Sequence, residues 1–101
     1  MPYRLIIARD VRRQIDELPG NIKAIARQQI GNLIINPRPP RSKELDGHPG
    51  HYRLHLTVKY RLIWKIVEED QLIEIEYVGP KPPDLYDRLG LARPADNLPE
   101  G

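Results

Sequence analysis

The 101-residue sequence contains no cysteine, which excludes disulfide bonds and thiolate metal ligands. A chain without cysteine suits a reducing compartment, and we expect a cytoplasmic protein. Ser42 is the only serine and no Gly-x-Ser-x-Gly motif is present, so nucleophile chemistry by cysteine is excluded and by serine nearly so. Glycine-rich phosphate loops are also absent, because Gly47, Gly50 and Gly79 are isolated turn glycines.

Long hydrophobic runs are missing as well. No segment approaches the roughly 20 apolar residues of a membrane helix, and the apolar run near the N-terminus is too short for a signal peptide. Hydrophobic residues make up 40% of the chain and charged residues 30%, which is typical of a soluble globular protein. The length suffices for one modest core, so we expect a single domain at residues 1–90 and a flexible tail at residues 91–101.

Charge is distributed unevenly along the chain. Residues 1–67 hold 13 Lys or Arg and 5 Asp or Glu, for a formal charge of +8, whereas residues 68–101 hold 3 and 9, for −6. A polyanion is a natural partner for the basic part, because each neutralised phosphate releases counterions. Two other interpretations stay open: basic helix surfaces are common, and an acidic protein would be attracted to the same surface.

Hydrophobic periodicity predicts a strand and then two helices. Residues 3–7 have the pattern of a strand. A helix is expected at residues 10–18, with Asp10 as its N-cap and a Pro-Gly pair at its end. A second helix is expected at residues 22–35, where Asn21 is the N-cap and the apolar positions form one stripe. The short break between the helices indicates a helical hairpin lying across a sheet.

Three strands are predicted next, at residues 51–58, 60–67 and 72–78. The first alternates apolar and polar residues, whereas the second has apolar residues on both faces and is therefore expected at the centre of the sheet. An extended proline-rich connector at residues 36–42 and a turn-rich loop at residues 43–50 precede them. The sheet face opposite the helices is expected to stay open, so the polar side chains of the strands must lie there.

A proline pair, Pro82-Pro83, suits the entry to a short helix that ends near Gly90. The resulting order is β-α-α-β-β-β followed by a short C-terminal helix. The predicted fold class is therefore α+β, with an antiparallel-type sheet that carries a helical hairpin on one face.

Side chains that bind phosphate or move protons lie on or just after the three predicted strands. They are Arg53, His55, Arg61, Lys81 and Tyr86. Neighbouring strands are about 4.8 Å apart, so residues distant in sequence converge on one patch. Two guanidinium groups on adjacent strands favour an anion between them, such as a phosphodiester.

Four of these five residues also have a purely structural interpretation. The two arginines would instead pair with Glu74 or Glu76 on the neighbouring strand, Lys81 would be a surface lysine, and Tyr86 would pack on the core. Trp64 is expected in the core.

The three histidines raise the question of a metal site. His51 and His55 are four residues apart, which would suit two ligands on a helix. The alternation around them indicates a strand, where they are about 13 Å apart. Neither a metal site nor a cofactor is therefore expected.

Several short motifs occur in the order and near the spacing of a known family. They are Lys43-Glu-Leu-Asp-Gly47, His51-Tyr-Arg-Leu54, Tyr60-Arg-Leu-Ile-Trp64, Tyr77-Val-Gly-Pro-Lys81 and Leu85-Tyr86. Together with the order of elements, they resemble the RelE/ParE family of toxins from type II toxin–antitoxin modules. The resemblance spans residues 1 to about 90 and is closer to the RelE branch.

The resemblance implies a ribosome-dependent, metal-independent mRNA endonuclease that cuts in the ribosomal A site by 2′-OH attack and yields a 2′,3′-cyclic phosphate. Arg53 and His55 occupy the places of two strand lysines of the family, and Arg61 matches a phosphate-binding arginine. Lys81 stands where an arginine is the proposed general acid, and Tyr86 matches a tyrosine that orients the nucleotide. Because a guanidinium group stays protonated, Arg53 cannot be the general base, and His55 is expected in that role. Arg53 and Arg61 are expected to stabilise the charge of the transition state. Lys81 is the expected general acid, and Tyr86 is expected to position the nucleotide.

The same resemblance implies its partners: a cognate antitoxin, the ribosomal A site and mRNA, with no membrane and no small-molecule cofactor. The antitoxin is expected to displace the short C-terminal helix easily, since little apolar area would hold it. Two other functions stay open, a ParE-like inhibitor of DNA gyrase and a non-catalytic binding module on the same scaffold, because fold alone does not choose between them.

Overall fold

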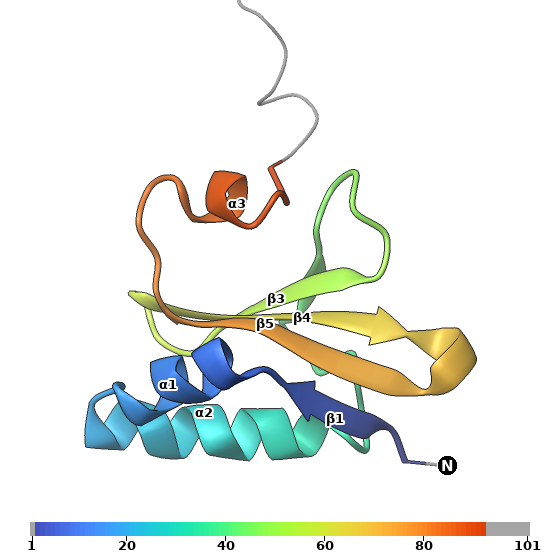
Figure 1. Ribbon diagram of the computed structural model, residues 1–101, viewed down its shortest axis with the longest axis horizontal. Helices are drawn as coiled ribbons and strands as arrows, with labels where there is room; N and C mark the ends of the chain where they lie inside the picture. The colour runs from blue at the N-terminus through green and yellow to red at the C-terminus, as the bar shows by residue number, and fades with distance from the viewer. Residues whose placement is uncertain (1, 93–101) are drawn as a thin grey trace, which may run out of the picture.

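The computed structural model describes residues 2–92. Five strands form one sheet in the order β1-β5-β4-β3-β2. The strands are β1 (Arg4–Ile7), β2 (Lys43–Glu44), β3 (His51–His55), β4 (Tyr60–Val67) and β5 (Leu72–Pro80). Helices α1 (Arg9–Asp16) and α2 (Gly20–Leu33) cover one face, and the short helix α3 (Leu85–Arg88) lies over the other (Figure 1). None of the helices within residues 2–92 has the length and hydrophobicity needed to cross a membrane.

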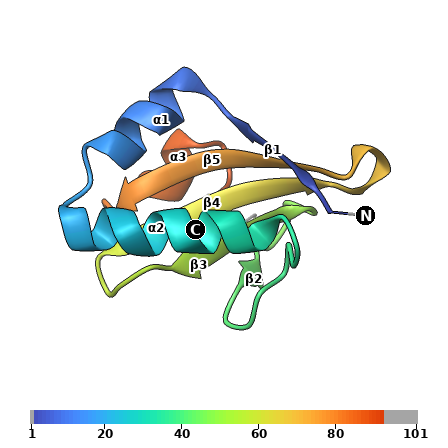
Figure 2. The same ribbon diagram turned by 90° about the horizontal axis from the view of Figure 1, so that it is seen from below.

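The predicted α+β fold is confirmed, including the central position of β4. The pairs β2–β3, β3–β4 and β4–β5 are antiparallel, but β1 pairs with β5 in parallel, so the sheet is mixed. A parallel pair needs a long connection, and the helical hairpin and the meander between β1 and β5 provide it. Figure 2 shows this from the helix side, with α2 lying across the sheet and β1 at the edge beside β5.

Both long helices begin earlier than the sequence suggests. The N-cap of α1 is Ala8 rather than Asp10, and that of α2 is Pro19 rather than Asn21; neither N-cap makes a side-chain hydrogen bond. Asp10 lies instead in the first turn of α1, where its charge still interacts favourably with the helix dipole. The Pro19 carbonyl accepts the first bond of α2, from the amide of Lys23 (2.8 Å). The helix ends are therefore set by the chain reversal at Pro19 and not by side-chain caps.

The main core lies between the helical hairpin and the sheet. Five of its residues are fully inaccessible to solvent: Ala26, Leu33, Leu62, Trp64 and Ile73. Trp64 is in the core as predicted; its ring stacks on Tyr52 with centroids 6.0 Å apart, and its Nε1 donates to the Pro37 carbonyl (3.0 Å). The proline-rich connector is thereby fixed against the edge of the core.

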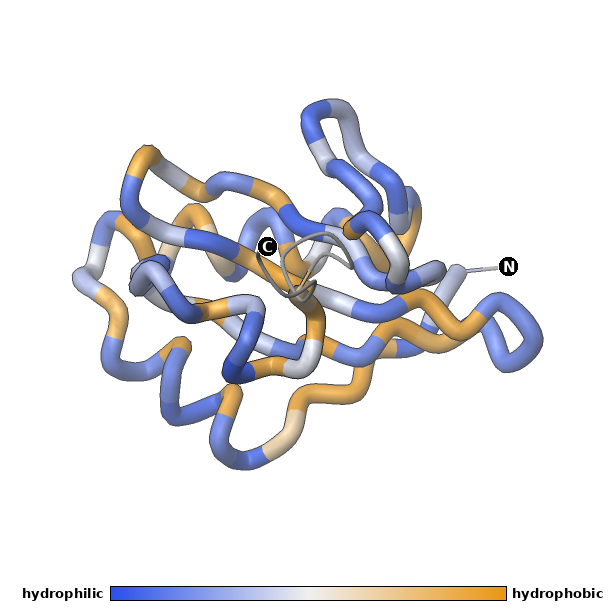
Figure 3. Tube along the Cα trace, turned by 90° about the horizontal axis from the view of Figure 1, so that it is seen from above, coloured by the Kyte–Doolittle hydropathy of each residue, from blue (hydrophilic) through white to orange (hydrophobic). Residues whose placement is uncertain are grey.

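The strand ends differ from those predicted. β3 stops at His55 rather than at residue 58, because the Leu56 amide pairs with the Tyr60 carbonyl (3.0 Å) and closes the hairpin there. Val58 in this turn is 88% exposed. β5 continues two residues further than predicted, to Pro80, and the two-residue strand β2 lies within the segment predicted as a loop. The hairpin between β4 and β5 is hydrophilic throughout (Figure 3).

A second apolar cluster holds α3 on the sheet face that was expected to be open. Ile63 of β4, Leu85 of α3 and Leu91 are buried together, at 0%, 1% and 4% exposure. The expectation that little apolar area holds the C-terminal helix is therefore wrong. Leu91 belongs to this packing, and residues 93–101 of the predicted tail lie outside the described residues.

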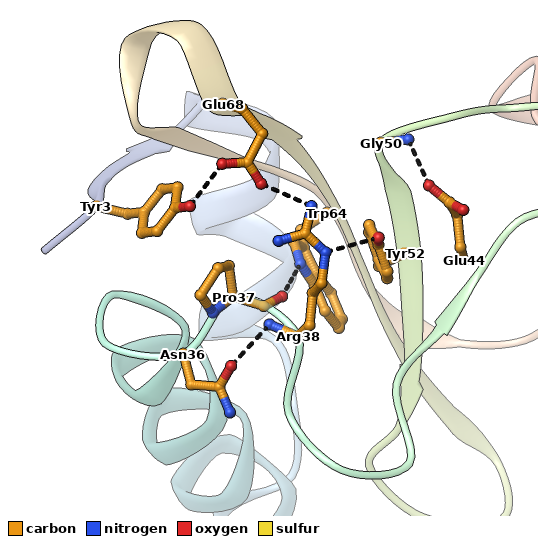
Figure 4. Close-up of polar contacts among 9 residues, drawn as sticks. All are labelled: Tyr3, Asn36, Pro37, Arg38, Glu44, Gly50, Tyr52, Trp64 and Glu68. Carbon is orange, nitrogen blue, oxygen red and sulfur yellow. Dashed lines mark hydrogen bonds and ion pairs between the residues drawn. The ribbon is translucent and has the colours of Figure 1, made fainter.

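A polar network joins the proline-rich connector (residues 36–42) to the hairpin between β4 and β5 (Figure 4). Arg38 donates to the Tyr52 hydroxyl (2.8 Å) and to Glu68 (2.6 Å). The second carboxylate oxygen of Glu68 accepts from the Tyr3 hydroxyl (2.7 Å). We call Arg38, Glu68, Tyr3 and Tyr52 the edge network; it links four segments distant in sequence.

Candidate functional site

A cleft of about 340 Å³ lies on the α3 side of the sheet. The loop after β2 and the α3 segment both rise on this side (Figure 1), and β3 contributes to the cleft between them. Its lining residues are Lys43, Glu44, Leu45, Asp46, Arg53, Lys81, Pro83, Tyr86 and Leu91. Three of the five residues predicted from sequence, Arg53, Lys81 and Tyr86, are therefore brought together in this cleft.

Arg53 lies in the middle of β3 and is opposite Lys43 of β2 on one side and Ile63 of β4 on the other. Alternation along the strand directs it to the α3 side, away from the core residues Tyr52 and Leu54. Its Nη1 donates to the Nε2 of His55, 2.8 Å away. The guanidinium is thus in the cleft and in contact with the next residue of the predicted site.

His55 is the last residue of β3 and is not part of the cleft lining. The residue is exposed, yet the protein around its ring desolvates it enough to lower its pKa, and the charges of Arg61, Arg53 and Lys81, in that order, lower it further. Arginine has no acceptor, so the Nε2 of His55 accepts the bond from Arg53 and carries no proton. His55 is therefore a neutral imidazole beside the cleft.

Arg61, directly opposite His55 on β4, does not line the cleft. Its Nη1 donates to three carbonyls of the β3–β4 turn, those of Thr57 (3.2 Å), Val58 (3.0 Å) and Tyr60 (3.2 Å). Its Nε is buried and has no hydrogen-bond partner among residues 2–92. Of the two predicted arginines, Arg53 therefore lines the cleft, whereas Arg61 is bound to the turn beside it.

Neither arginine makes the alternative ion pair with a β5 glutamate in the described part of the chain. Glu76 instead pairs with the Nδ1 of His51 (2.7 Å). The structural alternative for Arg61 is therefore the turn and not a neighbouring carboxylate.

Lys81 and Tyr86 meet at the C-terminal side of the cleft. The Nζ of Lys81 lies 5.7 Å from the centroid of the Tyr86 ring, within the range of a cation–π contact. The backbone N–H of Lys81 donates to the Lys59 carbonyl (3.0 Å), which fixes the chain just after β5. Tyr86 also packs on the second apolar cluster, as its structural interpretation expects, and it lines the cleft at the same time.

Sequence reasoning missed three charged residues of the cleft, Lys43, Glu44 and Asp46. They lie in the segment predicted only as a turn-rich loop, yet three of its first five residues, 43–47, are charged. Gly50 shapes this loop: its φ is +88°, and its N–H donates to Glu44 (3.0 Å, Figure 4). The charge density of the segment was the signal that could have revealed it.

The histidines point to separate partners. The Nε2 of His48 lies 2.7 Å from the Ala92 carbonyl, while His51 contacts Glu76 and His55 contacts Arg53. Within residues 2–92, no three His, Asp or Glu side chains are grouped so as to hold a metal ion.

No protein-family model and no curated protein sequence matches the chain, but solved structures do. RelE of the archaeal RelE–RelB complex from Pyrococcus horikoshii is 25% identical, with a TM-score of 0.70 over 82% of this chain and 99% of that one. The chain therefore has a RelE-like fold. A chain of the RelBE2 toxin–antitoxin complex of Mycobacterium tuberculosis is also 25% identical, with a TM-score of 0.65 over 80% of this chain and 100% of that one. A mutant of the E. coli toxin RelE in the free state is 19% identical, with a TM-score of 0.70 over 97% and 100%, which shows the shared fold.

The similarity of this RelE-like chain to known toxins supports a toxin role. The cleft provides a guanidinium, an ammonium group and an aromatic ring within one concave surface, with a neutral imidazole at its margin. Such a set can bind a phosphate and stack on a base.

Proposed function

We propose that this protein is the toxin of a type II toxin–antitoxin module and acts as a ribosome-dependent, metal-independent mRNA endonuclease. The supporting observation is that Arg53, Lys81 and Tyr86 line one cleft although 33 positions separate the first from the last. The RelE-like fold adds to this support.

The proposed reaction is an internal transfer at phosphorus. His55 Nε2 takes the proton of a ribose 2′-OH, the 2′-oxygen attacks the adjacent phosphorus, and the bond to the 5′-oxygen breaks. Lys81 gives a proton to that leaving oxygen. The products are a 2′,3′-cyclic phosphate and a 5′-OH, so no water and no redox partner is consumed. General acid and base groups of this kind typically accelerate such steps by about 100-fold or more.

Arg53 is the proposed clamp for the charge that develops on the phosphate oxygens. Its present hydrogen bond to His55 occupies the lone pair that the base requires. A phosphate in the cleft would offer Arg53 a stronger, charged acceptor. Substrate binding would then release the Nε2 of His55 for proton transfer.

Arg61 receives a more limited role than the sequence suggested. Its Nη1 is bound to the turn carbonyls, and its charge helps to lower the pKa of His55. We therefore propose that Arg61 positions the β3–β4 turn and keeps His55 neutral, and that direct contact with phosphate requires Nη1 to leave the turn.

A cognate antitoxin is the proposed protein partner. The Pyrococcus and Mycobacterium structures are complexes with an antitoxin. An antitoxin that covers the cleft would block Arg53 and Lys81 from RNA. Residues 1–67, with their charge of +8, would attract an acidic protein segment to the same region.

Cleavage of ribosome-bound mRNA tests the proposal. We would map 5′ ends by primer extension and measure single-turnover rates for wild type, Arg53→Ala, Lys81→Ala, Tyr86→Ala and the control Arg13→Ala on the exposed face of α1. Cuts in the A-site codon that slow by about 100-fold in the cleft variants, with Arg13→Ala unchanged, support the proposal. Equal rates in all variants contradict the proposed site. DNA breaks with filamentation on expression would indicate the gyrase inhibitor instead, and absence of toxicity the binding module.

A further inference from the structure

Two carboxylates share the cleft with the cationic groups. Glu44 and Asp46 line it together with Lys43, Arg53 and Lys81. A pocket that bound only phosphate would be weakened by these negative charges, because like charges repel across a few ångströms. The mixed lining suits a ligand that presents an anion at one end and hydrogen-bond donors at the other.

The two carboxylates differ in how far they are already engaged. Glu44 accepts a hydrogen bond from the Gly50 N–H (3.0 Å), which closes the loop. Asp46 makes no side-chain hydrogen bond or ion pair within residues 2–92 and is exposed at the cleft. Asp46 is thus the acceptor that remains available to a ligand.

The rest of the lining provides surface on which a base could pack. Tyr86 offers a ring face, and Leu45, Pro83 and Leu91 add apolar surface. The volume of about 340 Å³ lies within the range of small-ligand pockets. A base against the apolar side, with its phosphate towards Arg53 and Lys81, would bring the edge of the base near the β2–β3 loop.

A carboxylate only accepts hydrogen bonds, so it selects bases by their donors. The Watson–Crick edge of guanine has two adjacent donors, N1–H and the N2 amino group, which match the two oxygens of one carboxylate. Adenine and cytosine have one amino group beside an acceptor, and uracil has one N–H between two carbonyl oxygens. We propose that Asp46 is a specificity residue that selects guanine in the cleft, an inference that rests on the proposed RNA substrate.

Binding of mononucleotides tests this without the ribosome. Guanosine 3′-monophosphate and uridine 3′-monophosphate would be titrated by NMR into wild type, Asp46→Asn and the control Asp70→Asn. Asn keeps the turn chemistry that precedes Gly47, and Asp70 in the β4–β5 hairpin loses the same charge away from the cleft. Wild type is expected to bind the guanosine nucleotide about tenfold more tightly, and Asp46→Asn to reduce this preference to about twofold, with Asp70→Asn like wild type.

Equal affinities for the two nucleotides in wild type, or a preference that survives in Asp46→Asn, would overturn the inference, and so would the absence of any nucleotide binding. Cleavage of ribosome-bound mRNAs that differ only in the base at the cut separates this result from the proposed function. Cleavage at equal rates whatever the base would contradict the selection of guanine but would remain consistent with the proposed endonuclease. A guanine preference in binding without any mRNA cleavage would support the selection of guanine and contradict the proposed endonuclease.

Discussion

Arg53 and His55 are joined by a hydrogen bond of 2.8 Å from the guanidinium Nη1 to the imidazole Nε2. The direction of this bond fixes the state of His55, because arginine only donates. The imidazole is neutral, and its free proton is on Nδ1. Two residues separated by one position on the same face of β3 therefore hold each other in place, one as the anion-binding group and one as the candidate base.

The pKa of His55 is the first testable consequence. We expect it to lie below the ordinary value of about 6.5, because desolvation of the ring and then the charges of Arg61, Arg53 and Lys81 disfavour the imidazolium. Arg61→Gln should raise this pKa, since it removes the largest of the charge effects. An NMR titration of the ring signals measures it, with Arg13→Gln as the control. An unchanged pKa in Arg61→Gln would contradict the arrangement.

The same shift gives a signed dependence of stability on pH. Because the folded-state pKa of His55 is lower than its unfolded value, the unfolded chain binds more protons between the two values. The contribution of His55 is therefore fully present above about pH 6.5 and is lost as the pH falls towards the folded-state pKa. His55→Gln should flatten this part of the profile of Tm measured between about pH 8 and pH 5. A Tm profile of His55→Gln identical to that of wild type would contradict this contribution of His55 to stability.

The fold was largely predictable because long periodic segments determine it. The stripe of α2 includes Ile22, Ala26 and Ile30, all buried, and the apolar residues of β4 on both faces indicated a central strand. What failed were the ends of elements. Hydrogen bonds set those ends, such as the one from the Leu56 amide to the Tyr60 carbonyl, and periodicity carries no information about them.

The earlier end of β3 also explains why Arg61 binds the turn. A strand reaching residue 58 would have left no turn carbonyls near Arg61. With β3 ending at His55, the carbonyls of Thr57 and Val58 turn towards the guanidinium and bind it. Alternation along the strands, in contrast, was enough to bring Arg53 to the side where Lys81 and Tyr86 line the cleft.

Two glycine-to-alanine changes are expected to have opposite effects. Gly50 has φ of +88°, and an added Cβ would lie 3.2 Å from the Ile66 carbonyl oxygen, so Gly50→Ala should lower the free energy of unfolding by about 1–2 kcal/mol. Gly31 lies within α2 with nothing within 4 Å of an added Cβ. Gly31→Ala should therefore raise stability by about 1 kcal/mol. Urea denaturation measures both, and changes of the same sign would contradict the loop geometry.

The packing of α3 on the second apolar cluster gives a prediction about activity. Leu85 is 1% exposed against Ile63 and Leu91, and a buried Leu→Ala change typically costs about 2–5 kcal/mol. Because α3 has only four residues, this loss should appear as local opening that removes Tyr86 and Leu91 from the cleft. We expect Leu85→Ala to reduce mRNA cleavage while the far-UV circular dichroism stays near that of wild type. Leu89→Ala is unsuitable as a control because Leu89 is partly buried against the same cluster, so exposed Arg88→Ala serves instead.

Faster amide exchange at the C-terminal segment of Leu85→Ala, with unchanged protection in β4, would locate the opening in α3. Full cleavage activity in this variant would show that the cleft does not depend on the packing of α3.

The edge network predicts how stability responds to acid. The hydrogen bond from Tyr3, and then the one from Arg38, lower the pKa of Glu68 below its ordinary value. A depressed carboxyl pKa contributes stability that is present above about pH 4.5 and is lost as the pH falls through the folded-state value. Glu68→Gln should therefore be less stable than wild type at neutral pH and equal to it in strong acid, when Tm is measured across that range. Glu69→Gln removes the same charge from the adjacent position and serves as the control. It should leave the difference between the Tm at neutral pH and the Tm in acid as it is in wild type. An equal loss of Tm in both variants would mean that general surface charge, and not the edge network, stabilises this part of the protein.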